Sequence, residues 1–78
     1  MAKKKISSNQ PEIYRIIWSN IRKCQYINNI SDIQLAEMLE ISPRTLYNYD
    51  NEPFKLTLEK VQLFLNYTQI KMEQLISI

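Results

Sequence analysis

Apolar residues recur at intervals of three and four along nearly the whole chain, and no segment alternates apolar and polar residues for long. An α-helix turns once in about 3.6 residues, so this spacing places apolar side chains on one face of a helix, whereas a strand needs alternation. At 78 residues, 45% of them hydrophobic, the chain is long enough for one compact core. The sequence therefore predicts an all-α fold, with one domain over residues 9–78 after a flexible basic arm over residues 1–8.

The first helix is expected to start at Asn9 or Pro11 and to run to about Tyr26. Pro11 suits a first helical turn, where its missing N–H leaves no hydrogen bond unmade. Asn28 and Asn29 should end the helix, because asparagine tolerates the left-handed conformation found at many helix C-termini. The apolar face of this helix is expected to comprise Ile13, Ile16, Ile17, Ile21 and Cys24.

Two short helices are expected next, each preceded by a serine that can cap it. Ser31 precedes a helix that ends near Glu40, and Ser42 precedes another with Pro43 in its first turn. A serine hydroxyl at this position accepts a hydrogen bond from a free N–H group of the first turn. The inward side chains of these two helices are expected to be Leu35, Ala36, Leu39, Leu46 and Tyr49.

A loop over residues 50–56 and two further helices complete the expected five. Pro53 interrupts the helical pattern, since proline cannot continue a helix and biases the preceding residue away from the helical conformation. Thr57 should cap the fourth helix, and a short fifth helix should start at about Lys71. The apolar stripes of these two helices comprise Leu58, Val61, Phe64, Leu65, Met72, Leu75 and Ile76.

The composition argues against catalysis and against a bound cofactor. The chain has no histidine and no glycine-rich phosphate loop, and its single cysteine, Cys24, lies in the apolar pattern of the first helix. With one cysteine and no histidine, a single chain cannot assemble a disulfide or a Cys/His metal site. No run reaches the roughly 18 apolar residues of a membrane helix, and no apolar signal core follows the N-terminus. We expect a cytoplasmic protein that is not an enzyme and takes no cofactor, metal or small-molecule substrate.

Charge is distributed unevenly along the chain. Residues 1–30 hold six basic side chains and one acid, a net charge of +5, whereas residues 31–52 hold five acids and one base, a net charge of −4. The remainder adds +1, which gives +2 in all. An anionic partner would therefore be held partly by the N-terminal third of the chain.

Only "EIS" separates the second and third expected helices. This connection is too short for an antiparallel hairpin and favours two helices that cross at an angle. The stretch "SDIQLAEMLEISPRTLYNYD", Ser31–Asp50, resembles the helix-turn-helix of phage repressors and Cro proteins, the lambda repressor-like or XRE-type DNA-binding domains. The resemblance continues in register on both sides, over roughly residues 21–76. Outside the motif it is carried by Ile21, Arg22, Cys24, Ile30, Thr57, Leu58, Val61, Phe64, Ile70, Met72, Leu75 and Ile76.

The resemblance implies that the third helix lies in the major groove of double-stranded DNA, with Pro43, Arg44, Tyr47 and Asn48 toward the bases. Arg44 can bond a guanine edge through two donors, and Asn48 can do the same to adenine. Pro43 or Tyr47 could lie against a thymine methyl group, although a tyrosine here also suits the edge of a helix bundle. The residues implied to contact the DNA backbone are Ser31, Ser42, Thr45, Asn51 and Lys55, with Arg22 and Lys23 nearby.

Both ends of the chain carry residues with two interpretations. Lys3, Lys4 and Lys5 fit either an arm that wraps the duplex or a solubilising start. Family members usually act as dimers on near-palindromic operators, so a homodimer is expected. The residues expected to meet the partner subunit, unless they only close the core of one domain, are Met72, Ile76 and Ile78.

The family usually has glycine at three turn positions where this chain has Glu40, Glu52 and Gln69. If these residues keep the positive φ that glycine permits, each costs about 1 kcal/mol. The resemblance thus predicts either strained or reshaped turns.

The acidic balance of residues 31–52 opposes an approach to phosphates and leaves a second hypothesis open. In it, the helix-turn-helix scaffold binds another protein, as an antirepressor, an antitoxin-like module or an inhibitor of a host-defence enzyme. Aromatic residues are enriched at protein interfaces, and the chain offers Tyr26, Tyr47, Tyr49 and Tyr67. The sequence favours the first hypothesis, a small phage or mobile-element repressor that binds an operator.

Overall fold

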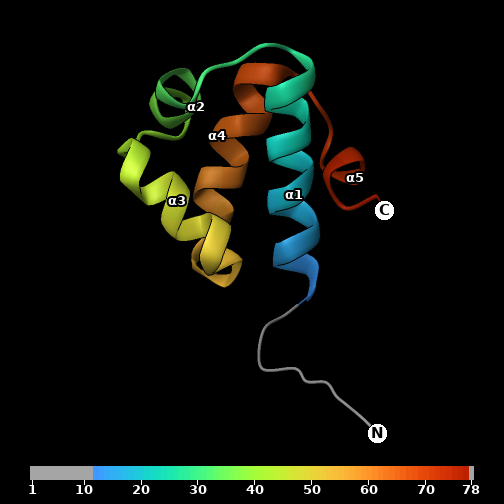
Figure 1. The fold of residues 1–78 in the computed structure, drawn as a ribbon. Helices are drawn as coiled ribbons and strands as arrows, with labels where there is room; N and C mark the ends of the chain where they lie inside the picture. Colours follow the sequence, from blue (N-terminus) through green and yellow to red (C-terminus); the bar gives the residue numbers. More distant parts are fainter. Residues whose placement is uncertain (1–11, 78) are drawn as a thin grey trace, which may run out of the picture.

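The computed structural model describes residues 12–77, which form five α-helices, one 3-10 helix and no strand (Figure 1). The all-α prediction is confirmed for this part of the chain, and the arm with Lys3, Lys4 and Lys5 lies outside it, as does Ile78. The helices are α1 (Glu12–Ile27), α2 (Asp32–Leu39), α3 (Pro43–Asn51), η1 (Pro53–Lys55), α4 (Leu58–Thr68) and α5 (Met72–Leu75).

The three predicted caps lie at the starts of α2, α3 and α4. The Ser31 hydroxyl accepts a hydrogen bond from the N–H of Gln34, whose side-chain oxygen accepts one in return from the N–H of Ser31. The hydroxyls of Ser42 and Thr57 accept the N–H groups of the residues three positions on, at 3.3 Å in both cases. Capping of this kind contributes about 1 kcal/mol per helix, so the local sequence fixes where these helices begin.

Helices α1, α2 and α4 end in the left-handed conformation without glycine. Positive φ occurs at Asn29 (58°), Glu40 (58°) and Gln69 (62°). Asn29 was expected to end α1, and Glu40 and Gln69 adopt the left-handed conformation that glycine most often takes at the end of a helix. Glu52 does not, since its φ is −134° and its backbone is reshaped where α3 gives way to η1. Two of the three turns are therefore strained, and the third is rebuilt.

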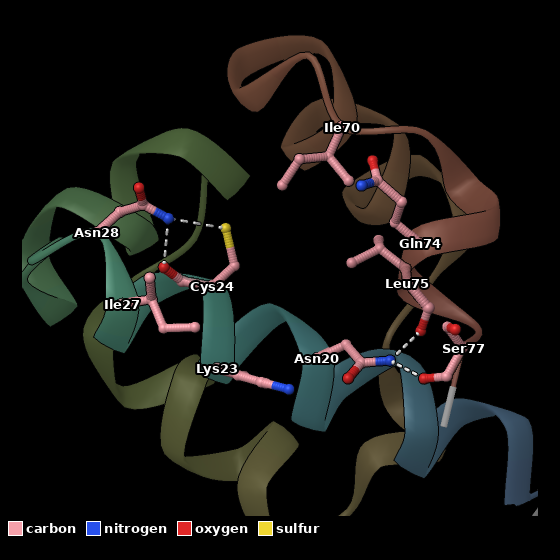
Figure 2. A pocket seen from close by; sticks show the side chains of 9 residues that line it. All are labelled: Asn20, Lys23, Cys24, Ile27, Asn28, Ile70, Gln74, Leu75 and Ser77. Carbon is pink, nitrogen blue, oxygen red and sulfur yellow. Dashed lines mark hydrogen bonds between the residues drawn. The ribbon is translucent and has the colours of Figure 1, made fainter.

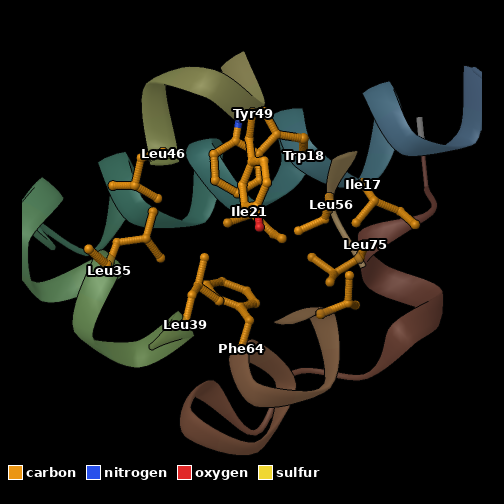
Figure 3. Close-up of a cluster of buried hydrophobic side chains, with 12 residues drawn as sticks. Ile17, Trp18, Ile21, Leu35, Leu39, Leu46, Tyr49, Leu56, Phe64 and Leu75 are labelled. Carbon is orange, nitrogen blue, oxygen red and sulfur yellow. The ribbon is translucent and has the colours of Figure 1, made fainter. Parts of the chain in front are cut away.

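One apolar core joins the five helices (Figure 3). Full burial of a large aliphatic or aromatic side chain stabilises a fold by roughly 1.5–3 kcal/mol. Eleven such residues and Ala36 therefore hold together helices too short to be stable alone. They are Ile17, Trp18, Ile21, Leu35, Ala36, Leu39, Leu46, Tyr49, Leu56, Val61, Phe64 and Leu75.

The structure corrects the predicted apolar faces at Ile13 and Leu58 and, in part, at Cys24. Ile13 is 43% exposed, because the buried face of α1 is rotated toward Trp18 and Gln25. Leu58, the first residue of α4, is 66% exposed, and Leu56 on the other side of the cap is buried in its place. Cys24, expected in the core, is only partly buried against it.

Around α1 the other elements divide into two groups. Helix α5 packs against one side of α1, whereas α2 packs against α3 and α4, and η1 contacts both α1 and α3 (Figure 1). Within residues 12–77, no helix combines the length and the apolar character needed to cross a membrane. The arrangement leaves one face of α3 uncovered.

Candidate functional site

Helix α3 shows four of its residues to the outside on one face. Pro43, Arg44, Tyr47 and Asn48 are all exposed, and their spacing places them side by side along the helix. Leu46 and Tyr49 alternate with them and are buried, which fixes the rotation of α3 about its own axis. The side chains of Arg44 and Asn48 make no hydrogen bond or ion pair with any residue among 12–77.

An ion pair joins the C-terminal end of α3 to α1. The Arg22 guanidinium donates from Nε and Nη2 to the two carboxylate oxygens of Asp50, at 3.0 and 2.8 Å. Trp18 Nε1 donates to Asp50 Oδ1 at 2.7 Å, and the guanidinium carbon lies 5.5 Å from the centre of the Trp18 ring. Trp18 also meets Tyr49 edge to face, with ring centres 5.2 Å apart. These directional contacts hold α3 at one angle to α1.

The same arginine reaches the start of α2. Arg22 Nη1 donates to Asp32 Oδ1 at 2.8 Å and to Gln25 Oε1 at 2.7 Å. Gln25 is buried, and its Nε2 donates to the same Asp32 oxygen at 2.7 Å. No buried side-chain nitrogen or oxygen of the described residues lacks a hydrogen-bond partner. A single cation thus lies between two carboxylates from different helices.

The second oxygen of Asp32 holds a residue of the exposed α3 face. The Tyr47 hydroxyl donates to Asp32 Oδ2 at 3.1 Å. Tyr47 is 52% exposed, so its side chain is accessible to solvent while its hydroxyl is held by the carboxylate of α2. We name the connected side chains the Arg22 network: Trp18, Arg22, Gln25, Asp32, Tyr47 and Asp50.

The network lowers the pKa values of its two carboxyls and raises that of its phenol. Hydrogen bonds from Gln25 and then Arg22 lower the pKa of the Asp32 carboxyl. Burial by itself would raise the pKa of Asp50, but hydrogen bonds from Arg22 and Trp18 outweigh it and leave that pKa below its ordinary value. The bond to Asp32 raises the pKa of the Tyr47 phenol. Both carboxyls are therefore ionised at neutral pH and Tyr47 is protonated.

Several residues expected to contact a DNA backbone already serve the fold. The Ser31 and Ser42 hydroxyls cap helices, and Thr45 Oγ1 lies 3.1 Å from the Ser42 hydroxyl. Asn51 Nδ2 donates to the carbonyl oxygen of Tyr47 at 3.3 Å. Lys55 pairs with Glu52 at 3.1 Å, on the exposed surface where such pairs hold side chains only weakly.

The adjacent basic residues Arg22 and Lys23 face different parts of the molecule. Arg22 joins the network beside α3, whereas Lys23 lines a pocket of about 320 Å³ between α1 and α5 (Figure 2). Figure 2 shows Cys24 and Ile27 of α1 opposite Ile70 and Leu75 across this pocket. The structure therefore brings Arg22 close to the α3 face and separates Lys23 from it.

Two of the residues expected at a dimer interface, Met72 and Ile76, lie on and just after α5. Met72 is 36% exposed and Ile76 is 42% exposed, while Leu75 between them is buried. Asn20 Nδ2 donates to the carbonyl oxygens of Leu75 and Ser77, at 2.6 and 2.8 Å, and so ties this end of the chain to α1. Two apolar side chains are thus free to meet a partner.

Sequence reasoning did not find the Arg22 network as a unit. Arg22 was assigned to DNA contact, whereas Asp32 and Asp50 were counted only among the five acids of residues 31–52. Trp18 and Asp50 are separated by 32 positions, and Arg22 and Asp50 by 28, so no local pattern links them. The three- and four-residue spacing of Trp18, Arg22 and Gln25 places them on one helix face, which was the available signal.

Among residues 12–77, no group of three or more His, Cys, Asp and Glu side chains is placed to hold a metal ion. Comparison of the chain with protein-family models, with curated proteins and with solved structures finds no match.

Proposed function

We propose that this protein binds double-stranded DNA sequence-specifically as a small repressor of the phage or mobile-element kind, with α2 and α3 acting as a helix-turn-helix and α3 lying in the major groove. The single observation that carries the proposal is the exposed face of α3, where Arg44 and Asn48 have no partner among residues 12–77 while Leu46 and Tyr49 anchor the helix. Both exposed types suit base edges, arginine for guanine and asparagine for adenine.

The Arg22 network supports the proposal electrostatically. An acidic balance around α2 and α3 would repel phosphates, but Arg22 lies 2.8 Å from a carboxylate oxygen of each of Asp32 and Asp50. Its charge offsets one of their two charges where the first turn of α2 and the last turn of α3 would approach the duplex. The repulsion is therefore smaller than the sequence count of acids implies.

The test is fluorescence anisotropy on duplexes from DNA flanking the gene, over a series of salt concentrations, with wild type, Arg44→Ala and Asn48→Ala. Each substitution should cost about 1–3 kcal/mol of discrimination between sites. Lys71→Ala and Asn66→Ala are matched controls, because both residues are exposed away from α3 and should leave site preference unchanged. Site preference that survives Arg44→Ala and Asn48→Ala would refute the assignment of α3 as the reading helix.

We further propose that two copies bind together through α5, since exposed Met72 and Ile76 flank the buried Leu75. Sedimentation of wild type against Ile76→Lys measures this directly. The expected result is a dimer that weakens at least tenfold in the variant, because a lysine amine would enter an apolar interface. Equal sedimentation of both as monomers, with and without DNA, would reject it.

The second candidate function is a protein-binding module, and the surface near the end of α1 favours it. Tyr26 is 87% exposed and Ile27 is 67% exposed, and Ile27 lines the pocket between α1 and α5. Aromatic and apolar side chains beside a pocket are typical of protein contacts. Absence of binding to any duplex at low salt, together with a pull-down partner lost in Tyr26→Ala, would favour this function.

A further inference from the structure

We propose that Asp32 is a positioning residue that fixes the polarity of the Tyr47 hydroxyl, so that Tyr47 offers DNA only a hydrogen-bond acceptor and prefers a base that presents an amino group, cytosine or adenine. The inference rests on the proposed function, because it names what one residue of the α3 face recognises. Three hydrogen bonds at the Asp32 carboxylate carry it.

The carboxylate itself is fixed in place from α1. Its Oδ1 accepts from Gln25 Nε2 at 2.7 Å and from Arg22 Nη1 at 2.8 Å, and Gln25 is buried. With Oδ1 held by two donors, Oδ2 is aimed at α3, where it accepts from the Tyr47 hydroxyl at 3.1 Å. Asp32 therefore transmits the rigidity of a buried side chain to an exposed one.

The direction of the last hydrogen bond follows from chemistry. An ionised carboxylate has no proton to give, so the single hydroxyl proton of Tyr47 must point at Asp32. The phenol oxygen then has only lone pairs to offer outward. Because Tyr47 is 52% exposed on the same helix face as Arg44 and Asn48, this oxygen is accessible to a ligand of that face.

The major groove distinguishes bases by where donors and acceptors lie. Cytosine presents its N4 amino group and adenine its N6 amino group, whereas guanine presents only acceptors and thymine presents an acceptor and a methyl group. An acceptor-only tyrosine oxygen pairs with the two amino groups and meets guanine O6 or thymine O4 with lone pairs facing lone pairs. The polarity set by Asp32 thus excludes two of the four bases from that contact.

Asp32→Asn is a nearly isosteric test of this polarity. The oxygen of the asparagine amide would keep the place between Arg22 and Gln25, because both of those groups donate, and its NH2 would then face Tyr47. The amide would donate to the phenol oxygen, and the hydroxyl proton would turn outward. Tyr47 would then offer a donor, so its preference should move from cytosine or adenine toward guanine or thymine.

The first measurement needs no DNA. Spectrophotometric titration of the tyrosines, taken as the difference from Tyr47→Phe, isolates the phenol of Tyr47. Its pKa is raised by the hydrogen bond to Asp32 and should fall in Asp32→Asn, because an amide donor stabilises the phenolate that a carboxylate opposes. An unchanged Tyr47 titration in Asp32→Asn would overturn the inference whatever the protein binds.

The second measurement is base preference. All four base pairs are placed in turn at each position of the preferred site, and binding is measured for wild type, Asp32→Asn, Tyr47→Phe and the double variant. At one position, preference should change about two- to tenfold with Asp32→Asn, the range of one hydrogen bond. That change should vanish in the Tyr47→Phe background.

The charge lost in Asp32→Asn has a separate signature. Removing one negative charge should strengthen binding to every duplex, in both the Tyr47 and the Phe background, and most at low salt. A purely structural role for Asp32 would instead weaken binding to every sequence alike. Site-specific binding by the wild type with no change of base preference in Asp32→Asn would overturn the inference and leave the proposed function intact, whereas the absence of any sequence preference in the wild type would overturn both.

Discussion

The two sides of α1 are built in opposite ways. Trp18, Arg22 and Gln25 face α2 and α3, where polar side chains are bonded at 2.7 to 3.0 Å. Lys23 and Cys24 face α5 and the far end of α4, where they line pockets. One helix thus carries a bonded side and a loosely filled side, about half a turn apart.

The loosely filled side holds two neighbouring pockets, of about 320 and 400 Å³. Cys24, Asn28 and Ile70 line both of them, so the hollowed surface extends from α5 to the end of α2. Atoms that line an open pocket face solvent and do not pack against another helix there, whereas charge-assisted hydrogen bonds fix direction as well as distance. From this difference we expect α5 to separate from α1 at a lower free energy than α3 does, although the buried Leu75 and two hydrogen bonds from Asn20 also hold α5 in place.

The largest expected effect comes from substituting adjacent residues that face the two sides. Arg22→Met leaves Asp32 and Asp50 without their cation and should lower the free energy of unfolding by about 1–3 kcal/mol in urea denaturation. Lys23→Met makes the same kind of substitution, a basic residue replaced by methionine, at the next position. Its free energy of unfolding should stay within about 0.5 kcal/mol of the wild-type value. Equal losses in the two variants would show that the sides do not differ energetically.

Acid should act on the bonded side before the rest of the molecule. The pKa values of Asp32 and Asp50 are lowered by folding, so the unfolded chain binds protons at higher pH than the folded one. Their contribution to stability is therefore fully present above the unfolded value of about 3.9 and is lost as the pH falls through the lower folded values.

Thermal unfolding between neutral pH and the acid range, monitored by circular dichroism, measures this loss. In Arg22→Met the acid-dependent part of the decrease should shrink, because the carboxyls no longer have the cation that lowers their pKa values. An identical acid profile for wild type and Arg22→Met would place the sensitivity elsewhere in the chain.

The smallest expected effect concerns the turns that lead into and out of α3. Glu40 has φ of 58° and Glu52 has φ of −134°, so the same substitution should act with opposite sign. Glu40→Gly relieves the left-handed strain and should stabilise the fold by about 0.5–1 kcal/mol. Glu52→Gly adds flexibility to the unfolded chain and removes the exposed pair with Lys55, so it should destabilise the fold by a similar amount.

Chemical denaturation of the two glycine variants gives the comparison. Gln69 has φ of 62° between α4 and α5, so Gln69→Gly extends the comparison to the loosely filled side. This substitution should also stabilise the fold. Destabilisation by Glu40→Gly would mean that contacts of the glutamate outweigh its backbone strain.

The sequence predicted what depends on neighbours along the chain. Ser31, Ser42 and Thr57 cap the helices they precede, because a cap needs only the next three residues. The apolar spacing located the core but not the width of each buried helix face. The prediction that Ile13 and Leu58 face inward was therefore wrong. A face broad enough to include the indole of Trp18 depends on what packs against it.

The sequence predicted which residues of the candidate site are exposed, but not the contacts they make. Pro43, Arg44, Tyr47 and Asn48 were expected to face outward together, and they do. The hydrogen bond that holds Tyr47 was not predictable, since Tyr47 and Asp32 are 15 residues apart and meet only because α2 and α3 cross. The count of acids in residues 31–52 treated Asp32 only as a charge that opposes DNA, because the sequence does not show its hydrogen bonds.

Trp18 gives the protein an optical reporter in the place where one is most useful. It is the only tryptophan of the chain, it is 3% exposed, and its indole N–H is bonded to Asp50 while its ring meets Tyr49. Its emission therefore reports directly on the attachment of α3 to α1. A red shift should accompany any opening of that junction, whereas separation of α5 alone should leave the emission unchanged, so one unlabelled sample can distinguish local from global unfolding.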